Sequence, residues 1–154
     1  MKSSVLLSNK FKNIGWIILV LGFIVGIFYL LKGWDSDFLT TNVFAVSYGG
    51  VLGKYKFFGC VENNILDEIA SVLIVLGALL VVFSKEKNED EFIASLRLNA
   101  LSWAVFVNYA VLFVGIIFVF DVPFFWILVF NMFTILFIFI ARFYWLLYKA
   151  SKNE

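Results

Sequence analysis

The sequence contains no histidine, and its one cysteine is Cys60. The absence of histidine removes the commonest zinc ligand, the usual haem axial ligand and the commonest general base. A single cysteine excludes an intramolecular disulfide and a CxxC redox pair, so we interpret Cys60 as a small apolar residue in a loop. We therefore expect no catalytic residue, no metal site and no cofactor, and we predict that the protein is not an enzyme.

Charge is also scarce, with 15% charged residues and a formal net charge of +1. A net charge this close to zero gives no positive potential that would attract nucleic acid, so no nucleic-acid partner is expected. Hydrophobic residues make up 63% of the chain and the mean hydropathy is +0.99. Soluble domains have about 45–50% apolar and about 25% charged residues. The composition therefore predicts a protein whose main solvent is the lipid bilayer.

Four apolar runs approach the length of about 20 residues that a helix needs to cross a bilayer. They are Ile14–Leu31, Ile69–Phe83, Ala100–Phe120 and Phe124–Tyr148. The first run exceeds the roughly 7–15 residues of a signal-peptide core and lacks a small-residue cleavage site, so we interpret it as a retained crossing. We predict one all-α membrane domain over residues 1–154. It would be an antiparallel bundle of four transmembrane helices at about 14–32, 65–84, 89–121 and 123–149.

The basic residues predict the orientation of these helices. Nine of the 12 lysines and arginines fall at the two termini and in the second loop, and three fall in the first loop. Because cytoplasmic segments are enriched in Lys and Arg, we predict that both termini face the cytoplasm. The protein would then be a multi-pass protein of the bacterial cytoplasmic (inner) membrane.

The first loop, residues 33–64, is rich in aromatic and β-branched residues rather than in linker residues. Gly49-Gly50 separates two such stretches, which is typical of a two-residue hairpin turn. We therefore predict strands near Val43–Tyr48 and Val51–Phe58, which would form a short extracytoplasmic β-hairpin. The hairpin could be a lid, a binding surface or a passive cap.

Gly15, Gly22 and Gly26 share one face of the first predicted helix. Small residues let another helix backbone approach closely. This face could pack inside the chain's own bundle, or it could form the contact of a homo-oligomer.

Polar side chains within the third and fourth runs form a second candidate cluster. Asn108 lies about 12 Å into the membrane and Asn131 about 10 Å from the opposite boundary, counting about 1.5 Å per residue, with Thr134 one turn further in. Lipid offers these groups no partner, so we predict that Asn108 faces inward and bonds near Asn131 or Thr134. We favour the interpretation that these side chains hold the helices together through interhelical hydrogen bonds.

Further charged groups lie in the second loop and at the end of the fourth run. Asn88 followed by Glu91 resembles a capping box. The acidic residues 89–91 are interpreted as a solvated helix start, because consecutive helical residues point apart and cannot converge on a metal ion. Arg142 would reach the cytoplasmic interface and either extend into water or pair with Glu91 or a lipid phosphate.

Residues 61–68, 84–98 and 131–136 resemble segments of a family of small four-helix bacterial integral membrane proteins without an assigned function, and the likeness extends over roughly residues 60–148. The resemblance implies a four-helix integral membrane protein and assigns no site residue. It also suggests that the protein is a partner of a regulator or of a larger complex.

Two functions therefore stand as hypotheses. The first is a non-enzymatic inner-membrane protein that binds a protein partner or senses the membrane. The second is a small transporter or channel for an unidentified solute. No predicted crossing carries an acid or base at mid-membrane, as ion pathways usually do, and this favours the first hypothesis.

Overall fold

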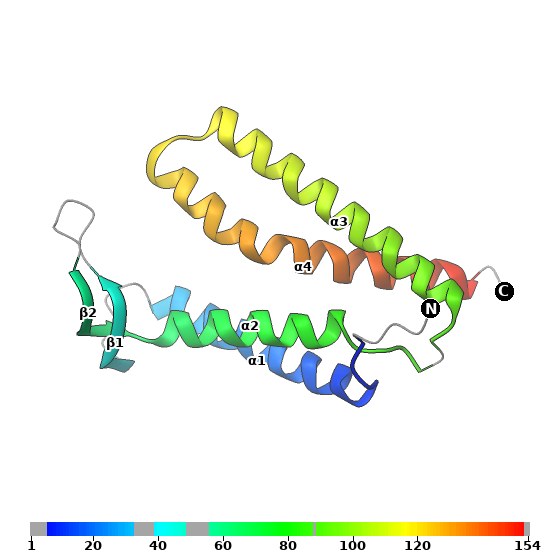
Figure 1. The fold of residues 1–154 in the computed structure, drawn as a ribbon, viewed down its shortest axis with the longest axis horizontal. Coiled ribbons are helices and arrows are strands. Elements are labelled where there is room, and N and C mark those ends of the chain that lie inside the picture. The colour runs from blue at the N-terminus through cyan, green and yellow to red at the C-terminus, as the bar shows by residue number, and fades with distance from the viewer. Residues whose placement is uncertain (1–5, 33–38, 49–55, 88, 153–154) are drawn as a thin grey trace. The chain divides into compact units, whose positions relative to one another are not determined.

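The computed structural model describes residues 6–32, 39–48, 56–87 and 89–152 (Figure 1). In order, the described elements are α1 (Lys10–Lys32), β1 (Thr40–Tyr48), β2 (Lys56–Asn64), α2 (Leu66–Val82), α3 (Glu91–Phe118) and α4 (Asp121–Lys152). The predicted mostly helical fold is confirmed, with four helices and one small antiparallel sheet among these residues. The predicted helix bounds differ from the observed ones by a few residues.

Three of the helices, α1, α3 and α4, are long and apolar enough to cross a membrane. The apolar stretches of these helices remain largely unburied by the protein, with 17%, 17% and 6% of their residues inside it. Helix α2 has 17 residues and is shorter than a typical crossing. Three helices therefore have dimensions that suit a bilayer, and α2 is short for this role.

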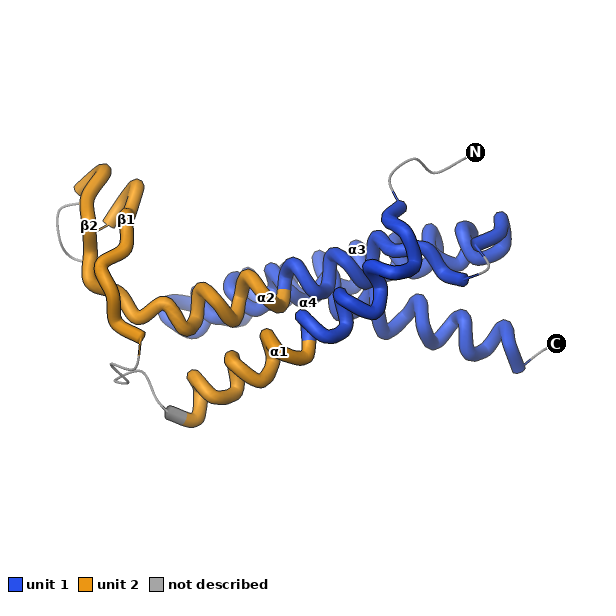
Figure 2. Tube along the Cα trace, turned by 90° about the horizontal axis from the view of Figure 1, so that it is seen from below, with its two compact units in different colours: residues 1–19, 75–154 blue, residues 20–74 orange. Residues whose placement is uncertain are grey.

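The chain divides into two compact units (Figure 2). The first comprises residues 1–19 and 75–154, and the second comprises residues 20–74.

The core of the first unit pairs small residues on α3 with large residues on α4. Ala100 and Ala104 are fully buried and lie one turn apart on α3. They join Phe139 and Phe143, whose rings stack with centroids 5.7 Å apart, in one cluster of buried apolar residues. Alanines at this spacing allow the aromatic side chains of a neighbouring helix to approach closely, which explains why the α3–α4 pair carries this core.

The second unit contains the hairpin and the adjoining parts of α1 and α2. Strands β1 and β2 pair antiparallel, with Thr40 opposite Asn64 and Tyr48 opposite Lys56. The predicted second strand near Val51–Phe58 overlaps the observed one at residues 56–58 but ends too early, because β2 continues to Asn64. The Gly49-Gly50 turn and residues 51–55 lie outside the described residues.

Two contacts explain this register. The Ile65 N–H donates to the Leu39 carbonyl at 3.3 Å, which fixes the base of the hairpin where α2 begins. Gly59 lies against the Tyr48 ring, where an added Cβ would come within 2.6 Å of the phenol oxygen. A larger residue at this position of β2 would have to displace the Tyr48 ring. A local turn rule considers neither the helix that follows nor this cross-strand contact.

Candidate functional site

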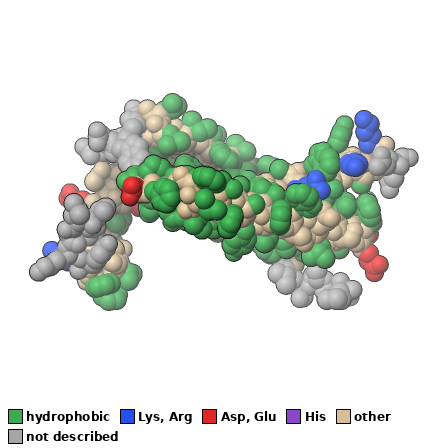
Figure 3. All heavy atoms as spheres, turned by 90° about the horizontal axis from the view of Figure 1, so that it is seen from above, with side chains coloured by type: hydrophobic (Ala, Val, Ile, Leu, Met, Phe, Trp, Pro, Cys, Tyr) green, Lys and Arg blue, Asp and Glu red, His purple; other side chains and the backbone are tan. Residues whose placement is uncertain are grey.

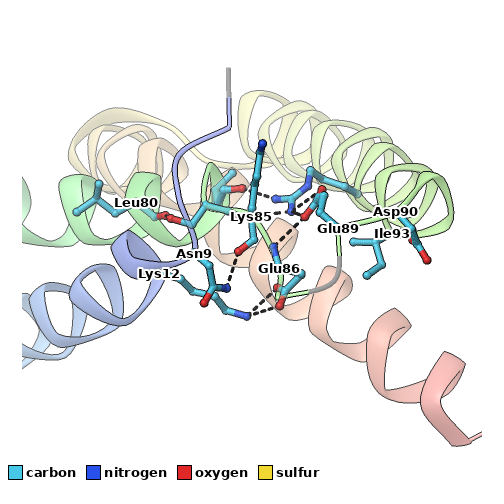
Figure 4. Close-up of polar contacts among 11 residues, drawn as sticks. Asn9, Lys12, Leu80, Lys85, Glu86, Glu89, Asp90 and Ile93 are labelled. Carbon is cyan, nitrogen blue, oxygen red and sulfur yellow. Dashed lines mark hydrogen bonds and ion pairs between the residues drawn. The ribbon is translucent and has the colours of Figure 1, made fainter. Parts of the chain in front are cut away.

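The C-terminal end of α2 is surrounded by polar groups from distant parts of the chain. A helix leaves its last four carbonyls without partners inside the helix. Here the partners come from the N-terminal segment, the loop after α2 and α3, all within the first unit (Figure 4). We call this cluster the α2 cap network, and its members are Leu7, Asn9, Lys12, Ser84, Glu86, Glu89 and Arg97.

Arg97 on α3 makes the largest number of these contacts. Its guanidinium donates to the Val82 carbonyl at 2.7 Å and to the Ser84 carbonyl at 3.3 Å. It also pairs with Glu89 at 3.1 Å and lies 4.7 Å above the centroid of the Phe143 ring. A cation at a helix C-terminus is favourable because the carbonyl ends carry partial negative charge. Arg97 therefore caps α2 from a different helix.

The N-terminal segment closes the other side of the network. The Leu7 N–H donates to the Phe83 carbonyl at 2.8 Å, and the Lys85 N–H donates to the Leu7 carbonyl at 2.9 Å. The Asn9 amide donates to the Lys85 carbonyl at 2.7 Å. Figure 4 shows this segment running beside the loop after α2. These bonds satisfy the exposed backbone of the loop and attach it to the start of α1.

A second ion pair joins Lys12 on α1 to Glu86 in the loop, with Nζ 2.6 Å from a carboxylate oxygen. The two side chains are 17% and 15% exposed, so water screens them less than it would a surface pair. The Lys12 ammonium also lies 4.9 Å from the centroid of the Tyr144 ring on α4. This ion pair thus links α1, the loop and α4.

The expected solvated acidic helix start at residues 89–91 is wrong for Glu89. Its carboxylate is 16% exposed, pairs with Arg97 and accepts a hydrogen bond from the Glu86 N–H at 2.8 Å. Glu89 precedes α3, so its side chain is not held to the helical spacing that would direct it outward. The helix cap is Asp90, which accepts from the Ile93 N–H at 2.8 Å. Asn88, proposed for that role, lies outside the described residues.

A hollow of about 290 Å³ adjoins the network. Arg97 and Glu89 form its polar part, and the rest of its wall is apolar: Leu6, Val82, Phe83, Ala94, Leu98, Leu101 and Phe139. Both polar groups are already engaged with each other. The hollow can therefore accept an apolar group, and among its described lining residues the charged ones are this ion pair.

The amides of Asn108 on α3 and Asn131 on α4 bond to each other. The Asn108 amide donates to the Asn131 side-chain oxygen at 3.3 Å, and the Asn131 amide donates to the Asn108 side-chain oxygen at 3.2 Å. Asn108 is 6% exposed. Thr134 donates to the Phe130 carbonyl of its own helix at 3.0 Å. The structure thus brings two of the three predicted residues together, while Thr134 bonds within α4.

The three predicted packing glycines all face α2. A Cβ on Gly15 would lie 2.8 Å from Leu80 Cβ, and one on Gly22 would lie 2.8 Å from the Ile74 backbone nitrogen. A Cβ on Gly26 would lie 3.8 Å from Ala70 Cβ, which is an ordinary contact. Gly15 and Gly22 thus permit close packing within this chain.

The hairpin offers a different kind of surface. Phe44, Val46, Phe57 and Phe58 are 60–70% exposed. A hollow of about 580 Å³ lies between the strands and the start of α2, and Glu68 at its edge accepts from the Asn63 amide at 2.6 Å. Cys60 is exposed on β2. The hairpin is therefore an accessible surface with several aromatic side chains.

Among the described residues, no group of three or more His, Cys, Asp or Glu side chains is arranged to hold a metal ion. Comparison with protein-family models, curated proteins and solved structures gives no match to this chain.

Sequence reasoning missed the α2 cap network. The available signals were Arg97 near the start of an apolar run and the acidic residues of the preceding loop. Neither identifies a carbonyl partner that lies 15 residues away in the chain.

Proposed function

We propose that this protein is a non-enzymatic, multi-pass protein of the bacterial cytoplasmic membrane that binds a protein partner or senses the membrane. The observation that carries the proposal is the unburied apolar surface of α1, α3 and α4. Hydrophobic side chains dominate the helical surface drawn in Figure 3. Contiguous apolar patches of this extent are rare on soluble monomers and are typical of surfaces that contact lipid or protein.

In this proposal α2 is a fourth, short crossing, and the helices form an antiparallel bundle. The close packing at Gly15 and Gly22 supports this arrangement, because it places α1 along α2. Both termini and the α2 cap network lie in the cytoplasm, and the hairpin lies outside. The distribution of Lys and Arg supports this orientation.

The hairpin is the proposed contact surface. Exposed aromatic residues are enriched where proteins bind one another and where they contact the membrane interface. Phe44, Phe57 and Phe58 are 68%, 67% and 70% exposed and belong to the strands rather than to the apolar helices. The hairpin also ends one residue before α2, so a partner bound there could act directly on that helix.

A small transporter or channel is the alternative function. The Asn108–Asn131 pair would be its most suitable solute site, because these amides are polar groups within apolar helices. Since the two amides satisfy each other, a solute would have to break both bonds to bind there. This arrangement supports a packing role instead.

Photo-crosslinking in native membranes tests the proposal. A benzophenone-bearing phenylalanine analogue replaces Phe44 or Phe57 on the hairpin. Phe106 on α3, which is similarly exposed, is the control position. Phe106 is 70% exposed and should yield lipid adducts. A discrete protein adduct at the hairpin positions would support partner binding, and lipid adducts there would support membrane sensing. Reaction at Phe106 with none at either hairpin position would contradict the proposed contact surface.

A further inference from the structure

The C-terminal part of α4 carries basic residues in a setting unlike that of the α2 cap network. The Arg142 guanidinium lies over two indole rings, 5.1 Å from the Trp103 centroid and 4.7 Å from the Trp145 centroid. The Lys149 ammonium lies 5.6 Å from the same Trp145 ring. Arg142 and Lys149 are seven residues apart, so they share a face of α4. Arg142 therefore contacts both tryptophans, and Lys149 contacts one of them.

These two cations differ from Lys12 and Arg97 in their charge partners. In the described part of the chain, the ion pairs are Lys12–Glu86 and Arg97–Glu89. Neither Arg142 nor Lys149 has a carboxylate within ion-pair distance there. The Arg142 Nε atom is buried without a hydrogen-bond partner, and so is the Arg97 Nε atom. A cation gains from an anionic hydrogen-bond partner, and among the described residues no carboxylate supplies one to Arg142 or Lys149.

The position of Arg142 indicates which anion can reach it. Arg142 lies 19 residues after Pro123, or about 28 Å along α4, and a hydrocarbon core is about 30 Å thick. In the proposed membrane placement, the guanidinium therefore lies at the level of the lipid head groups. Tryptophans are also concentrated at this level.

An apolar surface continues from the cluster toward the hydrocarbon. Trp103 contacts Phe106 edge to face, with ring centroids 6.2 Å apart. Phe106 is 70% exposed and lies one turn further along α3. A ligand with a phosphate at the cations and an acyl chain along these rings would match both parts of the surface.

We propose that Arg142, Lys149, Trp103 and Trp145 bind the phosphate of an anionic phospholipid in the leaflet at this end of α4. The site rests on the proposed placement of α3 and α4 in a bilayer. Arg supplies planar donors suited to a phosphate, and Lys adds a second point charge. The two tryptophan rings lie against the guanidinium and hold it in place.

Tryptophan quenching by brominated lipids tests this site on the full-length protein in liposomes. Trp16, Trp34 and Trp126 are replaced by phenylalanine, which leaves Trp103 and Trp145 as reporters. Brominated phosphatidylglycerol should quench them at a lower lipid fraction than brominated phosphatidylcholine does. Each basic residue near an anionic surface contributes about fivefold in affinity, so R142Q or K149Q should each reduce this preference about fivefold. R142K should keep most of it.

K87Q is the matched control, because Lys87 is exposed and removing it changes the net charge equally. Its lipid preference should fall less than that of R142Q or K149Q, because Lys87 can contribute only the general attraction of a basic residue to an anionic surface. Soluble glycerol phosphate should not compete with the lipid, and competition by it would overturn a lipid source for the phosphate. Equal quenching by both lipids in the parent, or an unchanged preference in folded K149Q, would overturn the site. Failure of the parent to enter liposomes would instead contradict the membrane placement itself.

Discussion

The two ends of α2 are stabilised in different ways. At the C-terminal end, the carbonyls of Val82 and Phe83 are satisfied by Arg97 and by the Leu7 N–H, which come from distant parts of the chain. At the N-terminal end, the Leu66 N–H donates to the Asn64 side chain at 3.1 Å, a contact between near neighbours. The groups that cap the first end come from separate elements of the fold, whereas Asn64 caps the second end locally, next to the backbone bond between Ile65 and Leu39.

This difference implies unequal consequences for substitutions. A residue that satisfies several groups at a junction leaves each of them unpaired when it is removed. A local cap that is lost exposes one N–H, which water can reach at a helix end. Substitutions at the C-terminal end of α2 should therefore destabilise the protein more than those at the N-terminal end.

Arg97→Gln should have the largest effect, a loss of about 3 kcal/mol in the free energy of unfolding, because it leaves Glu89 partly buried without its partner. Unfolding of the purified protein in mixed detergent micelles measures this loss. Lys87→Gln is the control and should change stability by less than about 0.5 kcal/mol. The double variant Arg97→Gln/Glu89→Gln should lose less than the sum of the single variants. Additive losses would mean that the ion pair does not couple the two residues.

Gly22→Ala should cost about 2 kcal/mol, because the new methyl group would lie 2.8 Å from the Ile74 backbone nitrogen and would push the helices apart. Gly26→Ala is the matched control on the same helix face. Its Cβ would have an ordinary contact at 3.8 Å, so its stability should remain within about 0.5 kcal/mol of the parent. The same unfolding titration compares the two. Equal losses in both variants would show that α1 does not pack on α2 as described.

Asn64→Ala should cost about 1 kcal/mol, the usual loss when a side-chain acceptor at a helix start is removed. Asn64→Asp keeps the acceptor and should restore most of that stability. Hydrogen exchange of the first turn of α2, measured by mass spectrometry, reports the local effect. A loss as large as that of Arg97→Gln would contradict the proposed difference between the two ends.

Asn108→Leu should have the smallest effect, about 0.6 kcal/mol, the mean for hydrogen bonds between membrane helices. Its partner Asn131 loses the acceptor at 3.2 Å, and the new leucine recovers part of the loss by packing. Detergent unfolding measures the stability, and complementation of a deletion strain measures activity in the cell. Loss of activity in a folded Asn108→Leu protein would favour the transporter hypothesis over a packing role.

The sequence predicts the helices well because long apolar runs report directly on elements of membrane length. The Asn108–Asn131 contact was also predictable, since the short connection after α3 forces an antiparallel pair and fixes the depth of both amides. The glycine spacing indicated a packing face, but not that α2 covers Gly15 and Gly22.

The hairpin register and the α2 cap network could not be predicted in the same way. The pairing of β2 with β1 is accompanied by the bond between Ile65 and Leu39 and by the contact of Gly59 with Tyr48, and both contacts involve residues far apart in the chain. The buried position of Glu89 depends on Arg97 and on the path of the loop. Local rules for turns and caps carry no information on such pairings.

The accessibility of the two ends of α2 from outside the cell tests the proposed membrane arrangement most directly. Cys60 on the exposed hairpin is a native reporter for the N-terminal end, and Lys87→Cys in a Cys60→Ser background reports on the C-terminal end. In intact spheroplasts, a membrane-impermeant maleimide should label Cys60 and leave the cysteine at position 87 unlabelled until the membrane is opened. Labelling at position 87 from outside, or protection of Cys60 until the membrane is opened, would contradict the arrangement.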